Sequence, residues 1–84
     1  MHAGVRPGVP LELQRANDLL RIRAPFLSTT HGLGKYVVFV HTPFREVKRD
    51  ADKIGIDTGA CYVEPGYGKL TAFCLLTQET FQVE

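Results

Sequence analysis

The stretch of sequence that decides the fold runs from Lys35 to Ala60 and reads KYVVFVHTPFREVKRDADKIGIDTGA. It holds an apolar run at residues 36–40, a charged segment, and a second apolar run at residues 54–56. β-Branched and aromatic residues without alternation are typical of a strand that is buried on both faces. Polar residues follow each run directly, and strands that end in polar side chains commonly build reaction sites. This stretch is therefore the first candidate for a functional site, with His41 at its centre.

Length and composition limit the possible classes of protein. The chain has 84 residues, which is enough for one small domain over residues 1–84. Its 44% hydrophobic and 23% charged residues are compatible with a globular fold. A net charge of +1 gives no reason to expect binding to nucleic acid or to a membrane surface. The absence of an apolar signal-peptide core or a membrane-length apolar run predicts a cytoplasmic protein.

The order of the predicted elements indicates an α+β fold with one N-terminal helix and a mixed, mostly antiparallel sheet of four or five strands. Pro10 can begin the helix and Pro25 ends it, so the helix is predicted over residues 11–24. The strand at residues 35–41 is expected at the centre of the sheet. One helix covers only one face of a sheet, which predicts a missing N-terminal half or a second copy of the chain on the other face. The strands are predicted at residues 35–41, 46–49, 53–57, 69–76 and 80–83, the second and third forming a hairpin across residues 50–52.

The three histidines have different local settings. His41 follows a buried strand, where a neutral imidazole can bind a divalent metal or can simply cap the strand, and the local pattern favours the cap. His2 by itself is a terminal residue without a role. His31 lies between glycine-rich loop residues and is predicted at the surface.

Two further groups have alternative interpretations. The tripeptide 57–59, Asp-Thr-Gly, suits a phosphate or metal site, or else a turn in which Asp57 bonds its own backbone. The two cysteines do not form a disulfide framework. Cys74 is predicted to be a core residue within a strand, and no activating partner for a catalytic cysteine is evident nearby.

Five ordered blocks of sequence resemble the C-terminal half of calcineurin-like metallophosphatases. The resemblance covers nearly the whole chain and is strongest to the bacterial serine/threonine protein phosphatases, which are also similar to the symmetrical diadenosine tetraphosphatases. The blocks are HAGVRPGVPLE at 2–12, DLLRIRAPFL at 18–27, GKYVVFVHTPF at 34–44, KIGIDTGACY at 53–62 and GYGKLTAFCL at 66–75.

The resemblance implies part of a four-layer αββα sandwich and a hydrolase that acts on a phosphorylated substrate. Family members hold two divalent metals, commonly manganese, iron or zinc, bridged by a water or hydroxide that attacks phosphorus. Carried over to this sequence, His2 and His41 are ligands of one metal. The resemblance also implies that Tyr62 borders the substrate cleft. The resemblance assigns no catalytic acid or base to this chain.

The sequence departs from the family at several positions. Val40 replaces a glycine, which would permit an unusual backbone conformation before the histidine. Arg21 replaces a tryptophan, and residues 63–67 resemble a small insertion. The 84 residues also lack the Asp-x-His, Gly-Asp-x-x-Asp-Arg-Gly and Gly-Asn-His-Glu motifs, which supply most metal ligands and the general acid. The chain alone is therefore expected not to hydrolyse phosphoesters.

Several functions stay open at this point. The chain can be the C-terminal portion of a phosphoester hydrolase, either as a truncated reading frame or as one half of a split enzyme. It can instead be a non-catalytic module that binds another chain or itself through exposed strand edges. A single-metal binder that uses His2 and His41 is a third option. The sequence does not identify the substrate, the metal or the oligomeric state.

Overall fold

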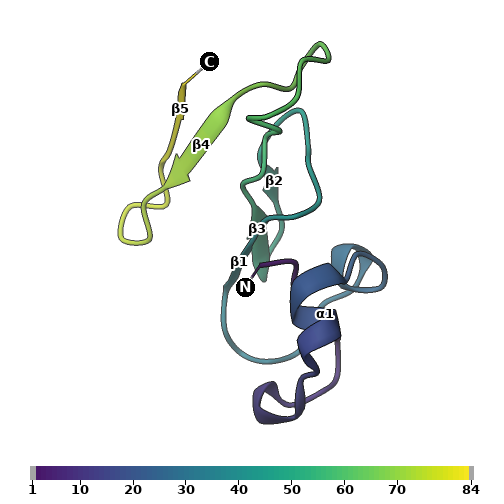
Figure 1. The fold of residues 1–84 in the computed structure, drawn as a ribbon. Coiled ribbons are helices and arrows are strands. Elements are labelled where there is room, and N and C mark those ends of the chain that lie inside the picture. Colours follow the sequence, from purple (N-terminus) through teal and green to yellow (C-terminus); the bar gives the residue numbers. More distant parts are fainter. Residues whose placement is uncertain (1, 84) are drawn as a thin grey trace.

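The computed structural model describes residues 2–83 and contains two small sheets (Figure 1). The predicted α+β class is confirmed, but the prediction of one sheet is wrong, because a long loop at residues 57–68 separates the last two strands from the others. In chain order the elements are η1 (Leu11–Leu13), α1 (Ala16–Arg21), η2 (Phe26–Ser28), β1 (Val37–Phe39), β2 (Lys48–Arg49), β3 (Lys53–Gly55), β4 (Leu70–Phe73) and β5 (Thr80–Val83).

The first sheet has three strands in the order β1-β3-β2. β3 runs parallel to β1, with Val38 opposite Ile54, and antiparallel to β2. The predicted hairpin is confirmed, and the Asp50 N–H closes its turn by donating to the Lys53 carbonyl oxygen at 2.9 Å. The prediction that the first strand is central is wrong, because β3 lies between the other two strands.

The helix predicted over residues 11–24 is broken at Gln14 and Arg15, where the backbone is extended. The Gln14 side-chain amide donates to the carbonyl oxygens of Arg6 at 3.0 Å and Val9 at 2.7 Å. Its Oε1 also accepts the Arg6 N–H at 2.8 Å. These bonds direct the Gln14 side chain toward the loop at residues 6–9. The predicted helix is therefore interrupted at Gln14 and divides into η1 and the short α1.

The N-terminal segment is held against the core instead of forming an unsupported loop. Ala3 and Val5 are fully buried, and the Ala3 N–H donates to the Leu19 carbonyl oxygen at 2.8 Å. Gly4 has a φ of +153°, and a Cβ atom at this position would collide with the Phe26 ring. Glycine therefore lets the backbone at residue 4 pack directly on the Phe26 ring. His2, two residues earlier, is exposed.

The core lies between the N-terminal segments and the three-stranded sheet (Figure 1). Its centre is a pair of fully buried rings, Phe26 and Phe39, in an edge-to-face contact with centroids 5.0 Å apart. The expectation that Phe26 packs into the core is confirmed. The buried residues of this cluster are Ala3, Val5, Ile22, Phe26, Val37 and Phe39, and Ile54 of β3 is also fully buried.

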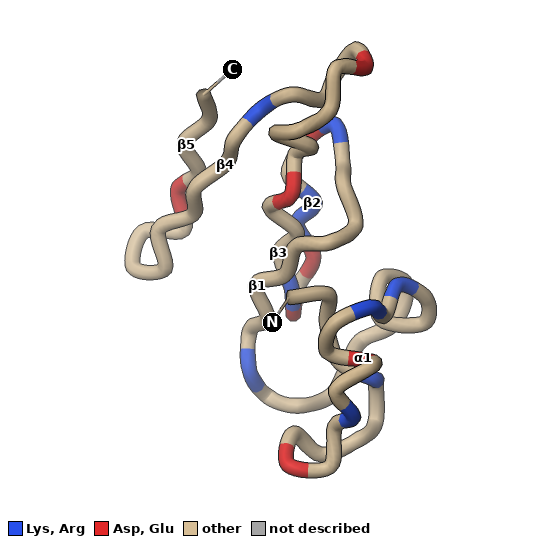
Figure 2. The backbone as a smooth tube through the Cα atoms, viewed as in Figure 1, with Lys and Arg blue, Asp and Glu red and all other residues tan. Residues whose placement is uncertain are grey.

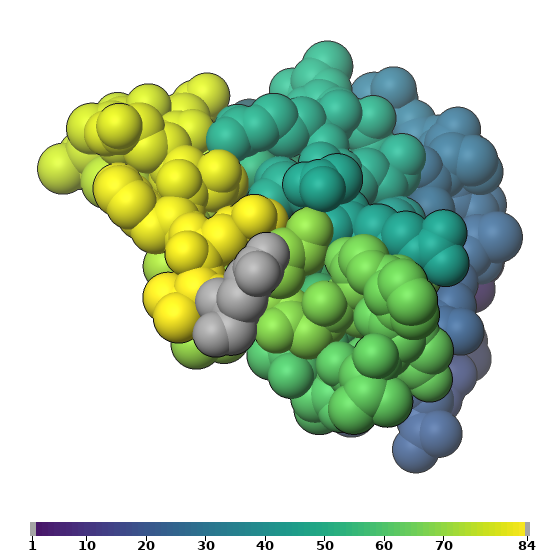
Figure 3. All heavy atoms as spheres, turned by 90° about the horizontal axis from the view of Figure 1, so that it is seen from above, coloured from purple at the N-terminus to yellow at the C-terminus, as the bar shows by residue number. Residues whose placement is uncertain are grey.

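The β4–β5 hairpin stands apart from the rest of the described chain. Few contacts join its strands to the first sheet, among them the Arg49 guanidinium of β2 over the Phe73 ring at 5.9 Å, and the hairpin lies at one side of the molecule (Figure 3). One face exposes Leu70, Phe81 and Val83, which are 57–67% accessible. Cys74 follows β4 and is only half-buried, so its predicted place in a buried strand is wrong. The hairpin is too narrow and too exposed to bury a side chain completely.

Charged residues of both signs are spread along the backbone (Figure 2). They are found in the loops around α1, in the β2–β3 hairpin and in the long loop, so neither sign is confined to one part of the chain. Within residues 2–83, no helix combines the length and apolar character that crossing a membrane requires.

Candidate functional site: a histidine pair after β1

The structure brings His2 and His41 together from distant parts of the sequence. Their ring centroids are 5.2 Å apart, and the ring planes are inclined by 56°. The Val40 N–H donates to the His2 carbonyl oxygen at 2.6 Å, so the N-terminal segment is fixed beside the end of β1. His2 is exposed and His41 is half-buried. A ligand from solvent can therefore reach both rings.

His41 has a strained backbone conformation. Its φ is +75°, and the Thr42 N–H donates to the Val40 carbonyl oxygen at 2.9 Å, which closes a three-residue turn around His41. Turns of this kind with a positive central φ are rare and strained, and such strain is concentrated at functional sites. Val40 has no positive φ. The valine at this position is therefore accommodated without backbone strain, and the unusual conformation falls on the histidine itself.

We expect the variant His41→Gly to be more stable than His41→Ala, by about 1 kcal/mol. Both variants remove the imidazole, but only glycine adopts a φ of +75° without strain. Urea unfolding followed by circular dichroism measures the difference. Equal stability of the two variants would show that the turn at His41 is unstrained.

Two imidazoles at this separation are compatible with one bound metal ion. Metal–nitrogen distances of about 2.0–2.1 Å put the centroids of two rings on a tetrahedral ion roughly 5 Å apart. Among residues 2–83, no group of three or more His, Cys, Asp or Glu side chains is arranged to hold a metal. The histidine pair therefore fits part of a metal site, and further ligands are required to complete it.

His31 is not a surface residue, as the sequence predicts, but is 2% exposed. Its Nε2 lies 3.0 Å from the Asp52 carbonyl oxygen, and its Nδ1 accepts the Leu33 N–H at 3.1 Å. The ring also stacks on Phe26. Because both ring nitrogens have partners and the ring is enclosed, His31 fixes its loop to β3 and is not available as a ligand.

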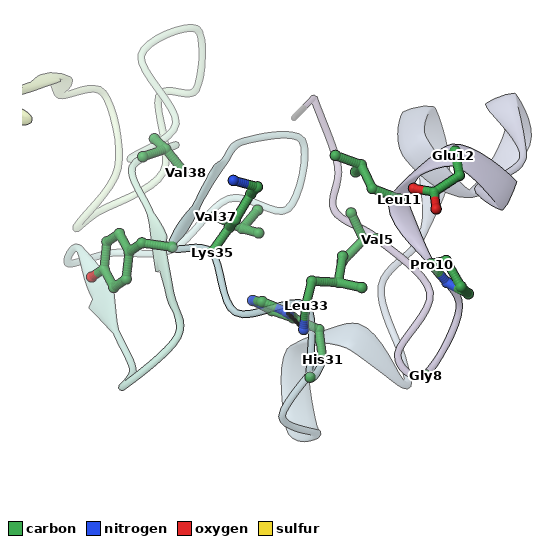
Figure 4. Close-up of a pocket in the computed structure, with 12 residues that line it drawn as sticks. Val5, Gly8, Pro10, Leu11, Glu12, His31, Leu33, Lys35, Val37 and Val38 are labelled. Atoms are coloured by element: carbon green, nitrogen blue, oxygen red, sulfur yellow. Dashed lines mark hydrogen bonds between the residues drawn. The ribbon is translucent and has the colours of Figure 1, made fainter.

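An apolar groove of about 780 Å³ opens between the N-terminal segment and the loop that leads into β1. Figure 4 shows Val5 and Leu11 on one side of the groove and Val37 on the other, with Glu12 and Lys35 supplying charges. Neither His2 nor His41 lines it. The groove and the histidine pair are therefore separate features of the surface.

The tripeptide that starts at Asp57 forms a turn. Asp57 Oδ1 accepts the Gly59 N–H at 3.0 Å, which confirms the interpretation that this side chain bonds its own backbone. The Asp57 carbonyl oxygen also accepts the Phe44 N–H at 2.8 Å. This bond ties the segment after His41 to the end of β3.

Tyr62 lies in the long loop and is 43% exposed. Its ring packs edge-to-face on Tyr67 at 5.7 Å, and the Arg45 guanidinium lies over Tyr67 at 5.4 Å. Two aromatic rings of the long loop and the Arg45 guanidinium, from the segment between β1 and β2, thus form one cluster. A substrate contact by Tyr62 stays a prediction.

Cys74 has local partners that the sequence pattern did not indicate. Hydrogen bonds from the Thr77 hydroxyl, and from the N–H groups of Thr77 and Leu76, hold the pKa of the Cys74 thiol below its ordinary value. None of these groups can act as a base. The hydrogen bonds close the turn between β4 and β5.

One polar group beside the histidines was not singled out from the sequence. The hydroxyl oxygen of Thr42 is buried and has no hydrogen-bond partner among the residues that the structure describes. Thr42 directly follows His41, and its backbone N–H closes the strained turn. A sequence pattern carries no signal for such an unpaired hydroxyl, because pairing depends on the tertiary structure.

Comparisons with protein-family models, curated proteins and solved structures found no match to this chain. The features of the chain that bear on function are therefore the geometry of the histidine pair and the family resemblance of the sequence blocks that contain His2 and His41.

Proposed function

We propose that this chain is the C-terminal part of a metal-dependent phosphoester hydrolase of the calcineurin-like type. In this proposal it contributes one portion of an αββα sandwich and supplies two imidazoles to a dinuclear metal site. The proposal also places the protein in the cytoplasm, in line with its two unpaired cysteines.

The observation that carries this proposal is the contact between His2 and His41. The family resemblance names these two residues as ligands of one metal, although they are far apart in sequence. In the structure their ring centroids lie 5.2 Å apart, and a backbone hydrogen bond at Val40 fixes the two segments together. The strained turn at His41 adds support, because such strain persists only where the surrounding structure holds it in place.

In this proposal, the described residues supply some of the metal ligands but no acid or base for the hydrolysis itself. His2 and His41 would hold one ion of manganese, iron or zinc as neutral nitrogen ligands. When bound, the metal pair would supply an activated oxygen nucleophile for attack on phosphorus. A bridging carboxylate and a general acid have to come from outside the 84 residues, so the chain alone is proposed to be inactive.

We expect the 84-residue chain to bind Zn²⁺ through the histidine pair, and His2→Ala or His41→Ala to weaken that binding at least about tenfold. Each substitution removes one of two nitrogen ligands. Isothermal titration with Zn²⁺ measures the affinity. The same protein is expected to show no manganese-dependent turnover of p-nitrophenyl phosphate.

The matched control for this experiment is Asp57→Asn. Its carboxylate is engaged in a turn that asparagine also forms, so Zn²⁺ affinity should not change. Equal Zn²⁺ affinity of the wild type and both histidine variants would contradict the metal site. Robust turnover by the pure chain would contradict the claim that it is an incomplete enzyme.

A second candidate function is a non-catalytic module that associates with itself or with another chain. The exposed face of the β4–β5 hairpin favours it, because Leu70, Phe81 and Val83 present apolar surface beside an open strand edge. A chain that forms a stable dimer and binds no Zn²⁺ in the titration above would favour this function over the hydrolase.

A further inference from the structure

The turn between β4 and β5, called the tip below, holds the two most exposed leucines of the described chain. Leu75 is 74% exposed and Leu76 is 96% exposed. A single exposed leucine is ordinary on a protein surface, but two adjacent ones form a small apolar patch. The Cys74 N–H donates to the Glu79 carbonyl oxygen at 2.9 Å, and the Gln78 N–H donates to the Cys74 carbonyl oxygen at 2.7 Å. These bonds close the turn, so the two leucines are presented on a structured loop.

The same molecule carries the apolar groove of about 780 Å³ beside β1 (Figure 4). Its two walls are joined, because the Gly8 N–H donates to the His31 carbonyl oxygen at 3.1 Å. Val5 is fully buried and His31 is 2% exposed, which fixes the inner part of the groove. Leu11 and Tyr36 are 45% and 41% exposed and present apolar surface in it. A formed, mostly apolar groove of this volume is typical of a binding site.

The tip of a molecule does not fill the groove of that molecule. All the residues that line the groove lie between positions 5 and 38, and none belongs to the hairpin. The exposure of Leu76 also shows that its own chain does not cover it. The apolar tip and the apolar groove are therefore two separate surfaces of one chain, and each can be covered by a second copy.

The charges beside the two surfaces have complementary signs. At the groove, Glu12 and Lys35 are exposed and form no ion pair within residues 2–83. At the tip, Glu79 is likewise exposed and unpaired in the described chain, and the Arg49 guanidinium donates to the Gln78 carbonyl oxygen at 3.2 Å. A tip that enters the groove thus brings one acid and one base to one base and one acid.

We propose that the tip of one molecule inserts Leu75 and Leu76 into the groove of a second copy of the chain. The contact joins two different surfaces, so each pair of molecules keeps one free tip and one free groove, and association continues head to tail. Such a contact is smaller than the roughly 1,000 Å² of a stable interface, so the association is weak. It uses neither His2 nor His41 and does not depend on the proposed hydrolase function.

Sedimentation equilibrium of the metal-free wild type, at concentrations up to about 1 mM, tests this inference. The average mass should rise with concentration and pass that of a dimer. Leu75→Ser/Leu76→Ser removes the apolar tip, and Leu11→Asp places a carboxylate in the groove. Each variant alone should associate at least about tenfold more weakly than the wild type, because the apolar contact is lost.

Mixing the two variants gives the sharpest result. The tip variant keeps a working groove and the groove variant keeps a working tip, so an equimolar mixture should form a dimer and nothing larger. Val63→Ser is the matched control, because Val63 is also 96% exposed but belongs to neither surface. It should associate as the wild type does. Circular dichroism checks that every variant is folded.

Amide NMR spectra of the wild type provide a test that needs no variant. On dilution, the resonances of the tip and those of the groove should shift together. A wild type that stays monomeric overturns the inference, and so do shifts confined to one of the two surfaces. A monomeric mixture beside an associating wild type would mean a symmetric contact, such as one through Phe81 on the face of the hairpin. Zn²⁺ binding decides the proposed function separately, since the samples compared here contain no metal.

Discussion

Phe26→Ala is expected to lower the free energy of unfolding by about 3–5 kcal/mol. Phe26 is fully buried and makes the central edge-to-face contact of the core with Phe39. Its ring also lies under Gly4 and stacks beside His31. Alanine would leave a cavity where three separate segments meet, and a small domain has little stability to lose.

Urea unfolding at 25 °C, followed by far-UV circular dichroism, measures this loss. The matched control is Phe81→Ala in β5, where the ring is 57% exposed and its removal should change the free energy of unfolding by less than about 1 kcal/mol. Similar losses for the two variants would mean that the core is not centred on Phe26.

Asp52→Asn is expected to lower the free energy of unfolding by about 3–5 kcal/mol, because it leaves a buried ammonium group without its counter-charge. The Lys53 side chain is 3% exposed, and its Nζ donates to Asp52 Oδ1 at 2.8 Å and to the Thr29 carbonyl oxygen at 3.1 Å. The same ammonium group lies over the Phe26 ring at 5.1 Å. The pair thus joins the start of β3 to the loop after η2.

The matched control is Asp50→Asn, two residues earlier. Asp50 pairs with Lys48 at 3.6 Å, and both side chains are about one-third exposed. An exposed pair of this kind contributes less than about 1 kcal/mol. Urea unfolding of both variants compares a buried and an exposed ion pair on the same hairpin. Equal decreases in the free energy of unfolding would mean that water solvates the Lys53 ammonium group when the Asp52 carboxylate is absent.

The same pair predicts how stability changes with pH. Burial raises the pKa of Asp52, but the hydrogen bond from Lys53, the bond from the His31 N–H and the nearby charges outweigh it, so the pKa lies below its ordinary value. A carboxyl group whose pKa is lowered on folding stabilises the protein above its unfolded pKa of about 3.9. This stabilisation should decrease as the pH falls through the lower, folded pKa. Asp52→Asn should not show that acid-dependent loss.

The sequence predicts the strands better than the helix, for a physical reason. The β2–β3 and β4–β5 hairpins depend on short runs of residues joined by turn residues, and both features can be seen in the local sequence. The helix depends on Gln14, whose amide bonds the loop at Arg6 and Val9 instead of continuing a helix. The spacing of residues around Gln14 cannot predict these bonds, because they form only once the N-terminal segment is packed on the core.

The three histidines also separate what the local sequence predicts from what depends on tertiary contacts. His31 looks like a surface residue because its neighbours are loop formers, but its main partner, Asp52, is 21 residues away. The local pattern also favours a capping role for His41 and no role for His2. Only the resemblance across ordered blocks predicts that these two rings lie close together. A family resemblance implies a tertiary structure, and the local spacing of residues does not.

The isolation of the β4–β5 hairpin has a consequence for the energetics of the whole chain. Few bonds connect the hairpin to the first sheet, among them those of Thr58 to Lys69 and Thr71 and that of the Arg49 guanidinium to the Gln78 carbonyl oxygen. Opening the hairpin exposes little surface that is not already in contact with water, so it can unfold while Phe26 and Phe39 stay packed. We therefore expect amide protons of β4 and β5 to exchange with solvent through local opening rather than through global unfolding.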